Sequence, residues 1–206
     1  MAVALALRFP AARVRAVELQ EVAHARLGRN ALLNGAGARV EAALRDAARD
    51  GLPPAWRRRS HVVVCNPPFR PFGDAGPLPR DAERAASVAE GEPGAIGHFA
   101  AAAEGGLADG GLAAFVFPAA RSGELEGALR GAGLGRVAVV ELAHGGASDP
   151  GLEAVSVVLA VAGRPGEGEG PSTVRLPRRA LHEPGEEDRT RYAPWLERFM
   201  LSLPPA

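Results

Sequence analysis

Residues 61–69 read His-Val-Val-Val-Cys-Asn-Pro-Pro-Phe, and they predict a strand that stops abruptly. The valines Val62 to Val64 are β-branched and apolar without alternation, which is typical of a buried strand in a parallel sheet. The two prolines that follow remove backbone donors, so ladder pairing cannot continue beyond Asn66. Asn66 is therefore expected at the carboxyl edge of its strand, where ligands bind in open α/β sheets.

The residues at this strand end have the chemistry to hold an amino group that is conjugated to a π system. Such an amine is a poor nucleophile because its lone pair is delocalised. The side-chain oxygen of Asn66 and the carbonyl of Pro67 can accept its two hydrogens, while Pro68 continues the turn and Phe69 stacks on the planar group. The alternative is an ordinary strand that ends at a Pro-Pro turn, with Phe69 simply packed.

The rest of the chain alternates between helical and strand patterns. Helices are predicted over residues 1–9, 20–33, 92–107 and 121–130, and strands over 13–19, 39–44, 62–65, 112–117, 136–142, 154–161 and, as a short edge strand, 173–176. Gly110-Gly111 is expected to form the turn before the fourth strand. This succession favours a doubly wound α/β sheet that is mostly parallel, with an antiparallel pair formed by the strands at 136–142 and 154–161.

Acidic residues end the two strands that precede Asn66. Glu18 lies directly before a helix, where a carboxylate can accept hydrogen bonds from both ribose hydroxyls of an adenosyl cofactor. Asp46 follows the next strand and can accept from an adenine amino group. Each also has an ordinary interpretation, since Glu18 complements a helix dipole and Asp46 suits a turn. We expect Glu18, Asp46 and Asn66 on one edge of one sheet.

Composition bounds the remaining possibilities. A chain of 206 residues with 47% hydrophobic content is expected to form a single domain over residues 1–206, with a linker-like segment and C-terminal extension at 163–206. The formal net charge is zero, so no global basic field indicates a nucleic-acid partner. All basic side chains except histidine are arginine, and Arg57-Arg58-Arg59 is either a phosphate contact or a solvated turn.

Metal, disulfide and membrane functions are not predicted. The single cysteine, Cys65, lies in the apolar strand and is expected to be a buried, inert thiol. The five histidines show no ligand spacing, and no apolar run approaches the roughly 20 residues of a membrane span. We expect a cytoplasmic protein without metal, and a monomer.

Several motifs together resemble the bacterial tRNA1(Val) adenine-N6 methyltransferase family, among the small-domain methyltransferases with an Asn-Pro-Pro-Phe/Tyr motif. The matching segments are residues 14–20, Asn30-Ala-Leu-Leu-Asn34-Gly35, Arg39-Val40, 64–69, the Gly110-Gly111-Leu turn, Leu181-His-Glu183 and Tyr192-Ala-Pro194. The resemblance implies a Rossmann-like methyltransferase sheet and S-adenosylmethionine as cofactor. Asn66, Pro67, Pro68 and Phe69 would hold the target adenine of an RNA, a tRNA anticodon loop, while Glu18 would bind the cofactor ribose and Asp46 its adenine, with Asn66 beside the cofactor.

The chain departs from this family in two respects. Family members begin with a strand and a glycine-rich cofactor loop, which do not precede Met1, so we expect an N-terminally truncated domain that lacks its first, central strand. Phe69 also stands where many relatives have Tyr. Two alternatives therefore remain: a ribosomal-RNA guanine-N2 methyltransferase, and a non-catalytic remnant that has lost cofactor binding. The stretch at 70–91 is either a substrate-covering loop or an insertion without fixed structure.

Overall fold

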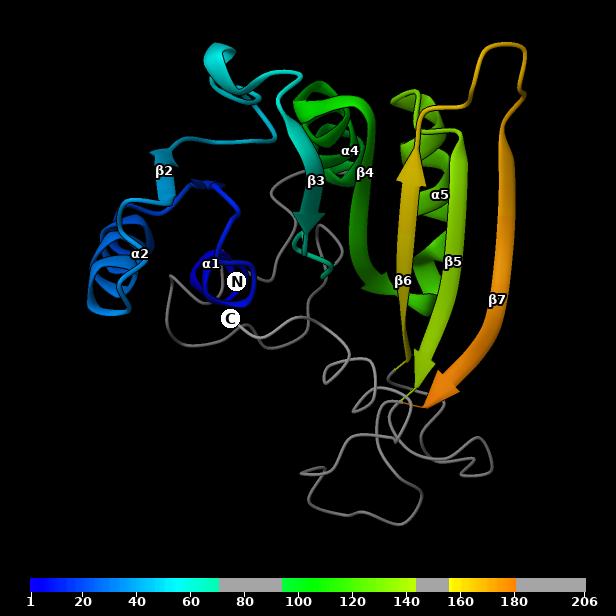
Figure 1. The fold of residues 1–206 in the computed structure, drawn as a ribbon. Coiled ribbons are helices and arrows are strands. Elements are labelled where there is room, and N and C mark those ends of the chain that lie inside the picture. Colours follow the sequence, from blue (N-terminus) through cyan, green and yellow to red (C-terminus); the bar gives the residue numbers. More distant parts are fainter. Residues whose placement is uncertain (71–93, 144–155, 181–206) are drawn as a thin grey trace.

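The computed structural model describes residues 1–70, 94–143 and 156–180 (Figure 1). The helices in these ranges are α1 (Ala2–Arg8), α2 (Glu21–Leu33), α4 (Ala95–Gly106) and α5 (Ser122–Gly131), with the short 3₁₀ turns η1 (Pro54–Trp56) and η2 (Ala119–Arg121). The strands are β1 (Val14–Glu18), β2 (Val40–Leu44), β3 (Ser60–Cys65), β4 (Leu107–Pro118), β5 (Arg136–Ala143), β6 (Ser156–Gly163) and β7 (Ser172–Ala180). The expected alternation of helices and strands is confirmed in these ranges.

The described strands form two sheets rather than the single sheet that we expected. β1 pairs in parallel with β2, and a separate five-stranded sheet has the order β3-β4-β6-β5-β7. No described strand pairs with both β1 and β3, so each of these two strands keeps an unpaired edge. The expected single sheet is therefore divided in two among the described residues.

Within the larger sheet, β3, β4, β5 and β7 run in one direction and β6 runs in the other. The predicted antiparallel pair is confirmed as β5 and β6, in register from Arg136 opposite Gly163 to Ala143 opposite Ser156. The predicted edge strand is β7, which pairs in parallel with β5. A mostly parallel sheet with one reversed strand therefore forms the body of the fold.

The hydrophobic core lies between this sheet and two helices. α4 and α5 cover the same face of the sheet in Figure 1, and the helices contact each other. Alternate residues of β4 point toward them, so Phe115 and Phe117 are fully buried. Leu125 and Leu129 of α5 pack into the same cluster. The carboxyl ends of β3 and β4 are thus supported by a rigid layer.

The valines of β3 are less buried than their sequence suggests. Val63 and Cys65 pack against the core, but Val62 is 61% exposed and Val64 is 38% exposed. The reason is that β3 is an edge strand in the described part of the chain, and only one of its faces meets α4. The prediction of a strand buried on both faces is wrong for these residues.

Gly110 and Gly111 lie inside β4 and not before it, which corrects the expected turn. The register changes here, because Ser60 lies opposite Leu107 whereas Val62 lies opposite Leu112. Gly110 has a positive φ of 72°, and a Cβ on Gly111 would come within 3.0 Å of the Ser60 carbonyl oxygen. Only glycine allows this bulge to approach β3 so closely.

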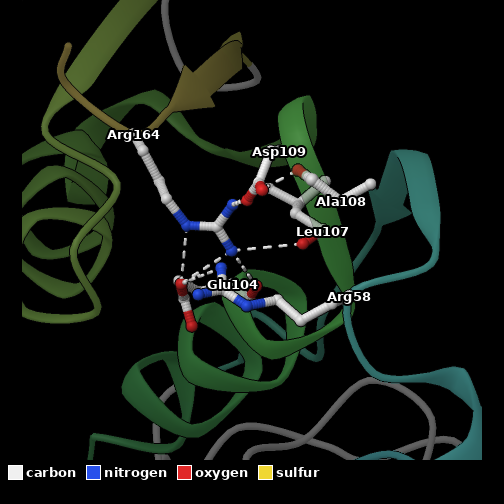
Figure 2. Close-up of polar contacts among 6 residues, drawn as sticks. All are labelled: Arg58, Glu104, Leu107, Ala108, Asp109 and Arg164. Atoms are coloured by element: carbon white, nitrogen blue, oxygen red, sulfur yellow. Dashed lines mark hydrogen bonds and ion pairs between the residues drawn. The ribbon is translucent and has the colours of Figure 1, made fainter.

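One arginine, Arg164 after β6, joins the end of α4 to the start of β4 (Figure 2). Its Nε donates to Glu104 Oε1 at 2.8 Å, and its terminal nitrogens donate to the carbonyls of Glu104 (2.9 Å), Leu107 (3.2 Å) and Ala108 (3.2 Å). Arg58 adds a longer bond to the same Glu104 carboxylate, at 3.4 Å. These bonds satisfy carbonyls that the helix end leaves without an intrahelical partner.

Candidate functional site

The Asn66–Phe69 segment follows β3 directly, as predicted. Cys65 is the last residue of β3 and lies opposite Phe115 of β4, which places Asn66 at the carboxyl edge of the five-stranded sheet. Asn66 is exposed, Pro67 is buried, and the Phe69 side chain is 43% exposed. Among the described residues none forms a hydrogen bond with the Asn66 side chain. The amide and the ring are therefore accessible, and neither is packed into the core.

Cys65 is an inert thiol rather than a nucleophile. Burial raises the pKa of Cys65 to about 12. The thiolate is the reactive form of cysteine, so a thiol with this pKa is unreactive near neutral pH. This agrees with the sequence-based expectation of an inert thiol.

Glu18 and Asp46 lie at neighbouring strand ends of the smaller sheet. Glu18 lies opposite Leu44, and its carbonyl accepts the Arg45 amide at 2.8 Å. One carboxylate oxygen of Glu18 accepts the Gln20 amide at 2.9 Å. One carboxylate oxygen of Asp46 accepts the amides of Ala48 (2.9 Å) and Arg49 (3.1 Å).

Asp46 thus has the turn role that we considered as its alternative, and Glu18 accepts an amide directly before α2, as its alternative role at a helix start would require. In each case these bonds use a single oxygen, and among the described residues no hydrogen bond to the second oxygen of Glu18 or of Asp46 is found. The turn bonds also fix the direction of each carboxylate.

An open hollow of about 320 Å³ begins one residue after Asp46. It lies between the segment that follows β2 and the helix α4, and its lining residues are mostly small: Ala47, Ala48, Gly51, Leu52, Arg57, His98, Ala101, Ala102 and Gly105. Arg45 closes the base of this segment, with Nε donating to the Gly51 carbonyl at 2.9 Å and a terminal nitrogen to the Asp50 carbonyl at 2.7 Å. Sequence reasoning did not find this hollow, because its two walls are about fifty residues apart.

The structure brings Glu18 and Asp46 together, but it does not join them to Asn66 through a common sheet. Glu18 ends β1 and Asp46 follows β2, whereas Asn66 follows β3. No hydrogen bond between strands links the two sheets in the described residues. The common edge that we expected is therefore divided into two parts.

The arginine run Arg57-Arg58-Arg59 is anchored through its backbone. The Arg58 amide donates to the Gly105 carbonyl at 2.9 Å and the Arg59 amide to the Gly106 carbonyl at 3.0 Å. Arg58 has a positive φ of 56°, and its guanidinium is bound to Glu104. The run therefore docks on the end of α4, and a phosphate contact by Arg57 or Arg59 stays a prediction.

The described residues form neither a metal site nor a membrane span. No group of three or more His, Cys, Asp or Glu side chains that could hold a metal ion occurs in residues 1–70, 94–143 and 156–180. No helix in the same ranges is both long and apolar enough to cross a membrane. The predicted features at 70–91 beyond Arg70, the loop after β5 and the Leu181-to-Pro194 motifs lie outside the described residues.

No protein-family model matches the chain, and no curated protein matches its sequence. Solved structures match its fold. A predicted O-methyltransferase from Agrobacterium tumefaciens aligns with a TM-score of 0.63 at 18% identity, over 97% of this chain and 82% of the other. A type I restriction-modification methyltransferase subunit from Streptococcus thermophilus gives 0.57 at 12% identity, over 91% and 41% of the two chains. The M protein of the type I restriction enzyme EcoKI gives 0.52 at 18%, over 91% and 40%.

The fold is that of the methyltransferases. The predicted Rossmann-like methyltransferase architecture is thereby confirmed. At these identities the likeness concerns the fold, and this chain spans about two fifths of the two restriction-system subunits. The choice of substrate and of reacting atom rests on the residues of the site.

Proposed function

We propose that this protein is an S-adenosylmethionine-dependent methyltransferase that acts on the exocyclic amino group of adenine in RNA, with tRNA as the substrate to test first. The observation that carries the proposal is the Asn66–Phe69 segment, which ends a strand of a methyltransferase fold with its amide and its ring exposed. A segment that served only as a turn would have no need of an accessible amide and an accessible ring side by side.

The chemistry of this segment suits an aromatic amine. Asn66 Oδ1 and the Pro67 carbonyl oxygen each accept one hydrogen of the amine, which favours a pyramidal nitrogen with its lone pair directed outward. Phe69 stacks on the base and fixes the line of attack. No histidine or carboxylate belongs to this segment, so the proton leaves after the methyl group is transferred and no general base takes part.

The proposed cofactor fits the residues of the smaller sheet. When bound, S-adenosylmethionine supplies a methyl group activated by its sulfonium. Glu18 has one carboxylate oxygen left for ribose hydroxyls, and Asp46 has one left for an adenine amino group. The hollow after Asp46 is lined by small side chains, which suits a flat, weakly polar ring. The shared methyltransferase fold supports the same cofactor.

An RNA loop is the proposed form of the substrate because its bases can be turned outward at little cost in pairing energy. The likeness to two methyltransferase subunits of restriction systems favours DNA as a second candidate acceptor. We further propose that the protein acts as a monomer in the cytoplasm.

The test is mass spectrometry of nucleosides. Bulk tRNA, ribosomal RNA and duplex DNA are each incubated with the purified protein and isotopically labelled S-adenosylmethionine, then digested. Labelled N6-methyladenosine from tRNA supports the proposal, and loss of the same nucleoside from a strain that lacks the gene confirms it in the cell. The Asn66→Ala variant is assayed in the same way and is expected to lose most of the turnover. Asn34→Ala, which changes an exposed asparagine at the end of α2, is its matched control.

The other outcomes discriminate between the alternatives. Labelled N2-methylguanosine from ribosomal RNA would favour the guanine methyltransferase, and labelled N6-methyladenine in DNA would favour the restriction-system type of acceptor. If calorimetry detects no binding of S-adenosylmethionine and no product forms, the non-catalytic remnant is the correct interpretation.

A further inference from the structure

Arg121 contacts the Asn66–Phe69 segment from a distant part of the chain. It is the last residue of η2, directly after β4, and one terminal nitrogen donates to the Phe69 carbonyl at 2.8 Å. Fifty-two residues separate the two partners. The contact exists because β3 and β4 are neighbouring parallel strands, which end at the same edge of the sheet.

The guanidinium of Arg121 is itself held on two other sides. Its Nε and its second terminal nitrogen donate to the two carboxylate oxygens of Glu124, at 2.9 and 2.6 Å. Its planar head also lies over the ring of Phe117, 5.0 Å from the ring centre. Phe117 is fully buried, so Arg121 lies directly on the hydrophobic core.

Arg121 and Glu124 differ in how far their side chains are buried. The Arg121 side chain is only 17% exposed, whereas Glu124 is 53% exposed. The hydrogen bonds from Arg121 hold the pKa of the Glu124 carboxyl below its ordinary value, so Glu124 is ionised at neutral pH. Glu124 binds two nitrogens of the Arg121 guanidinium and the Phe117 ring lies beneath it. The third nitrogen is therefore held in the direction of the Phe69 carbonyl.

We propose that Arg121, held by Glu124 and Phe117, is a positioning residue that fixes the Asn66–Phe69 segment at the substrate edge through the Phe69 carbonyl. This inference rests on the function proposed above. The bond holds the backbone of Phe69 and leaves its ring exposed for stacking. By fixing the end of the segment, Arg121 sets where the ring and the Pro67 carbonyl stand relative to the target base. Arg121 itself does not contact the base.

The first test measures the segment directly, in the full chain without substrate. Hydrogen exchange of the peptide that contains Phe69 and Arg70 is compared between the unmodified protein and Arg121→Met, Arg121→Lys and Glu124→Gln. We expect exchange of these amides to be about tenfold faster in Arg121→Met, because the segment opens more often once the bond that holds its backbone at the Phe69 carbonyl is lost, and intermediate in the two conservative variants. Arg136→Lys is the control. Arg136 forms an exposed ion pair with Glu169 at 3.9 Å, and its substitution is expected to leave exchange of the Phe69-Arg70 peptide unchanged.

The second test measures the consequence for function. We expect kcat for methyl transfer to fall about tenfold or more in Arg121→Met, because small displacements of positioning groups are costly, while KM for S-adenosylmethionine stays unchanged. Arg121→Lys restores part of the loss. Quenching of 2-aminopurine in an RNA loop, which reports stacking on Phe69, weakens in the same order.

The outcomes separate this inference from the proposed function. If the unmodified protein methylates no nucleic acid but exchange rises in the Arg121 variants, the proposed function fails and the fixing of the segment by Arg121 stands. If exchange in Arg121→Met equals that of the unmodified protein, the inference is overturned. An active protein whose Arg121→Met variant exchanges faster but turns over at the original rate overturns it too.

Discussion

The Asn66 side chain combines exposure with a fixed backbone, because β3 ends immediately before it and a buried proline follows it. Glu18 and Asp46 are arranged in a comparable way, since backbone amides of the next turn hold one oxygen of each carboxylate. Side chains that are held in this way can accept hydrogen bonds from a ligand without a large loss of conformational entropy.

Substituting Asn66 and Glu18 is expected to affect two different steps. Asn66→Ala removes an acceptor for the target amine, so turnover falls by roughly 100-fold or more while S-adenosylmethionine affinity is retained. Glu18→Ala removes the ribose acceptor, so the affinity is lost by about tenfold or more. Calorimetry and single-turnover methyl transfer measure the two effects. Equal affinity in Glu18→Ala would refute the ribose assignment, and equal turnover in Asn66→Ala would refute the mechanism.

Cys65 provides a test of burial at the end of β3. Burial raises the thiol pKa from 9.0 to about 12, so the folded protein keeps the proton where the unfolded chain loses it. We therefore expect negligible alkylation by iodoacetamide at pH 9 and rapid alkylation once denaturant is added. By linkage, stability is full below pH 9 and declines as the pH rises from about 9 toward 12. Because Cys65 is the only cysteine, the signal has one source, and fast alkylation of the native protein would contradict the burial.

At the scale of elements, arginines connect parts of the fold that the backbone ladders do not. Arg164 ties the end of β6 to the end of α4, and Arg121 ties the start of α5 to the segment after β3. In both cases the acceptors include main-chain carbonyls. A substitution at the acceptor residue leaves such a carbonyl in place, so these contacts depend on the arginine. The arrangement of α4 against β3 and β4 therefore depends on a few charged contacts as well as on the apolar core.

Arg164→Met is expected to lower the free energy of unfolding by about 2–3 kcal/mol, because hydrogen bonds to charged groups contribute about 1.5–3 kcal/mol. Arg164 is 24% exposed and its partner Glu104 is 27% exposed, so solvent replaces these bonds poorly. Arg136→Met, in a pair that is 62% and 57% exposed, is the matched control and should cost less than about 0.5 kcal/mol. Urea denaturation measures both, and equal losses in the two variants would show that the Arg164 contacts add nothing to stability.

At the scale of the whole molecule, four strands pair with only one neighbour among the described residues: β1 and β2 in the smaller sheet, and β3 and β7 in the larger one. β3 adds exposed apolar side chains to its open edge, with Val62 at 61% and Val64 at 38%. An unpaired apolar edge is a template for pairing with another strand. The strand that leads to the proposed active site is therefore one of the places where this chain is open to association.

At high protein concentration, where open edges favour pairing between copies of the monomer, Val62→Lys is expected to reduce self-association, because a charge on an open edge disfavours strand pairing. Leu33→Lys is the control, since Leu33 is 84% exposed but lies at the end of a helix. Sedimentation velocity at increasing concentration measures the effect. If both variants reduce association equally, the association comes from exposed apolar surface in general and not from the open edge of β3.

Local sequence determined the elements and their order. The valine run and the two prolines specify both the strand β3 and its end at Asn66, and the Gly-rich turns and apolar periodicity place most helices within a few residues. These features depend on neighbours in the chain, where propensity and missing backbone donors act directly. The methyltransferase architecture followed from that order.

Only the tertiary structure decided which strands share a sheet, how exposed β3 is, and which distant groups support the site. Pairing between strands is a contact between segments far apart in the chain, so the sequence around Val62 predicts a buried strand although β3 is an outer strand of the described sheet. The bond from Arg121 to the Phe69 carbonyl spans fifty-two residues and involves a backbone atom, which carries no signature in the sequence. The sequence around Gly110 and Gly111 predicts a turn for the same reason, since two of the three carbonyls that would crowd a side chain on Gly111 belong to Ser60 and His61 of β3.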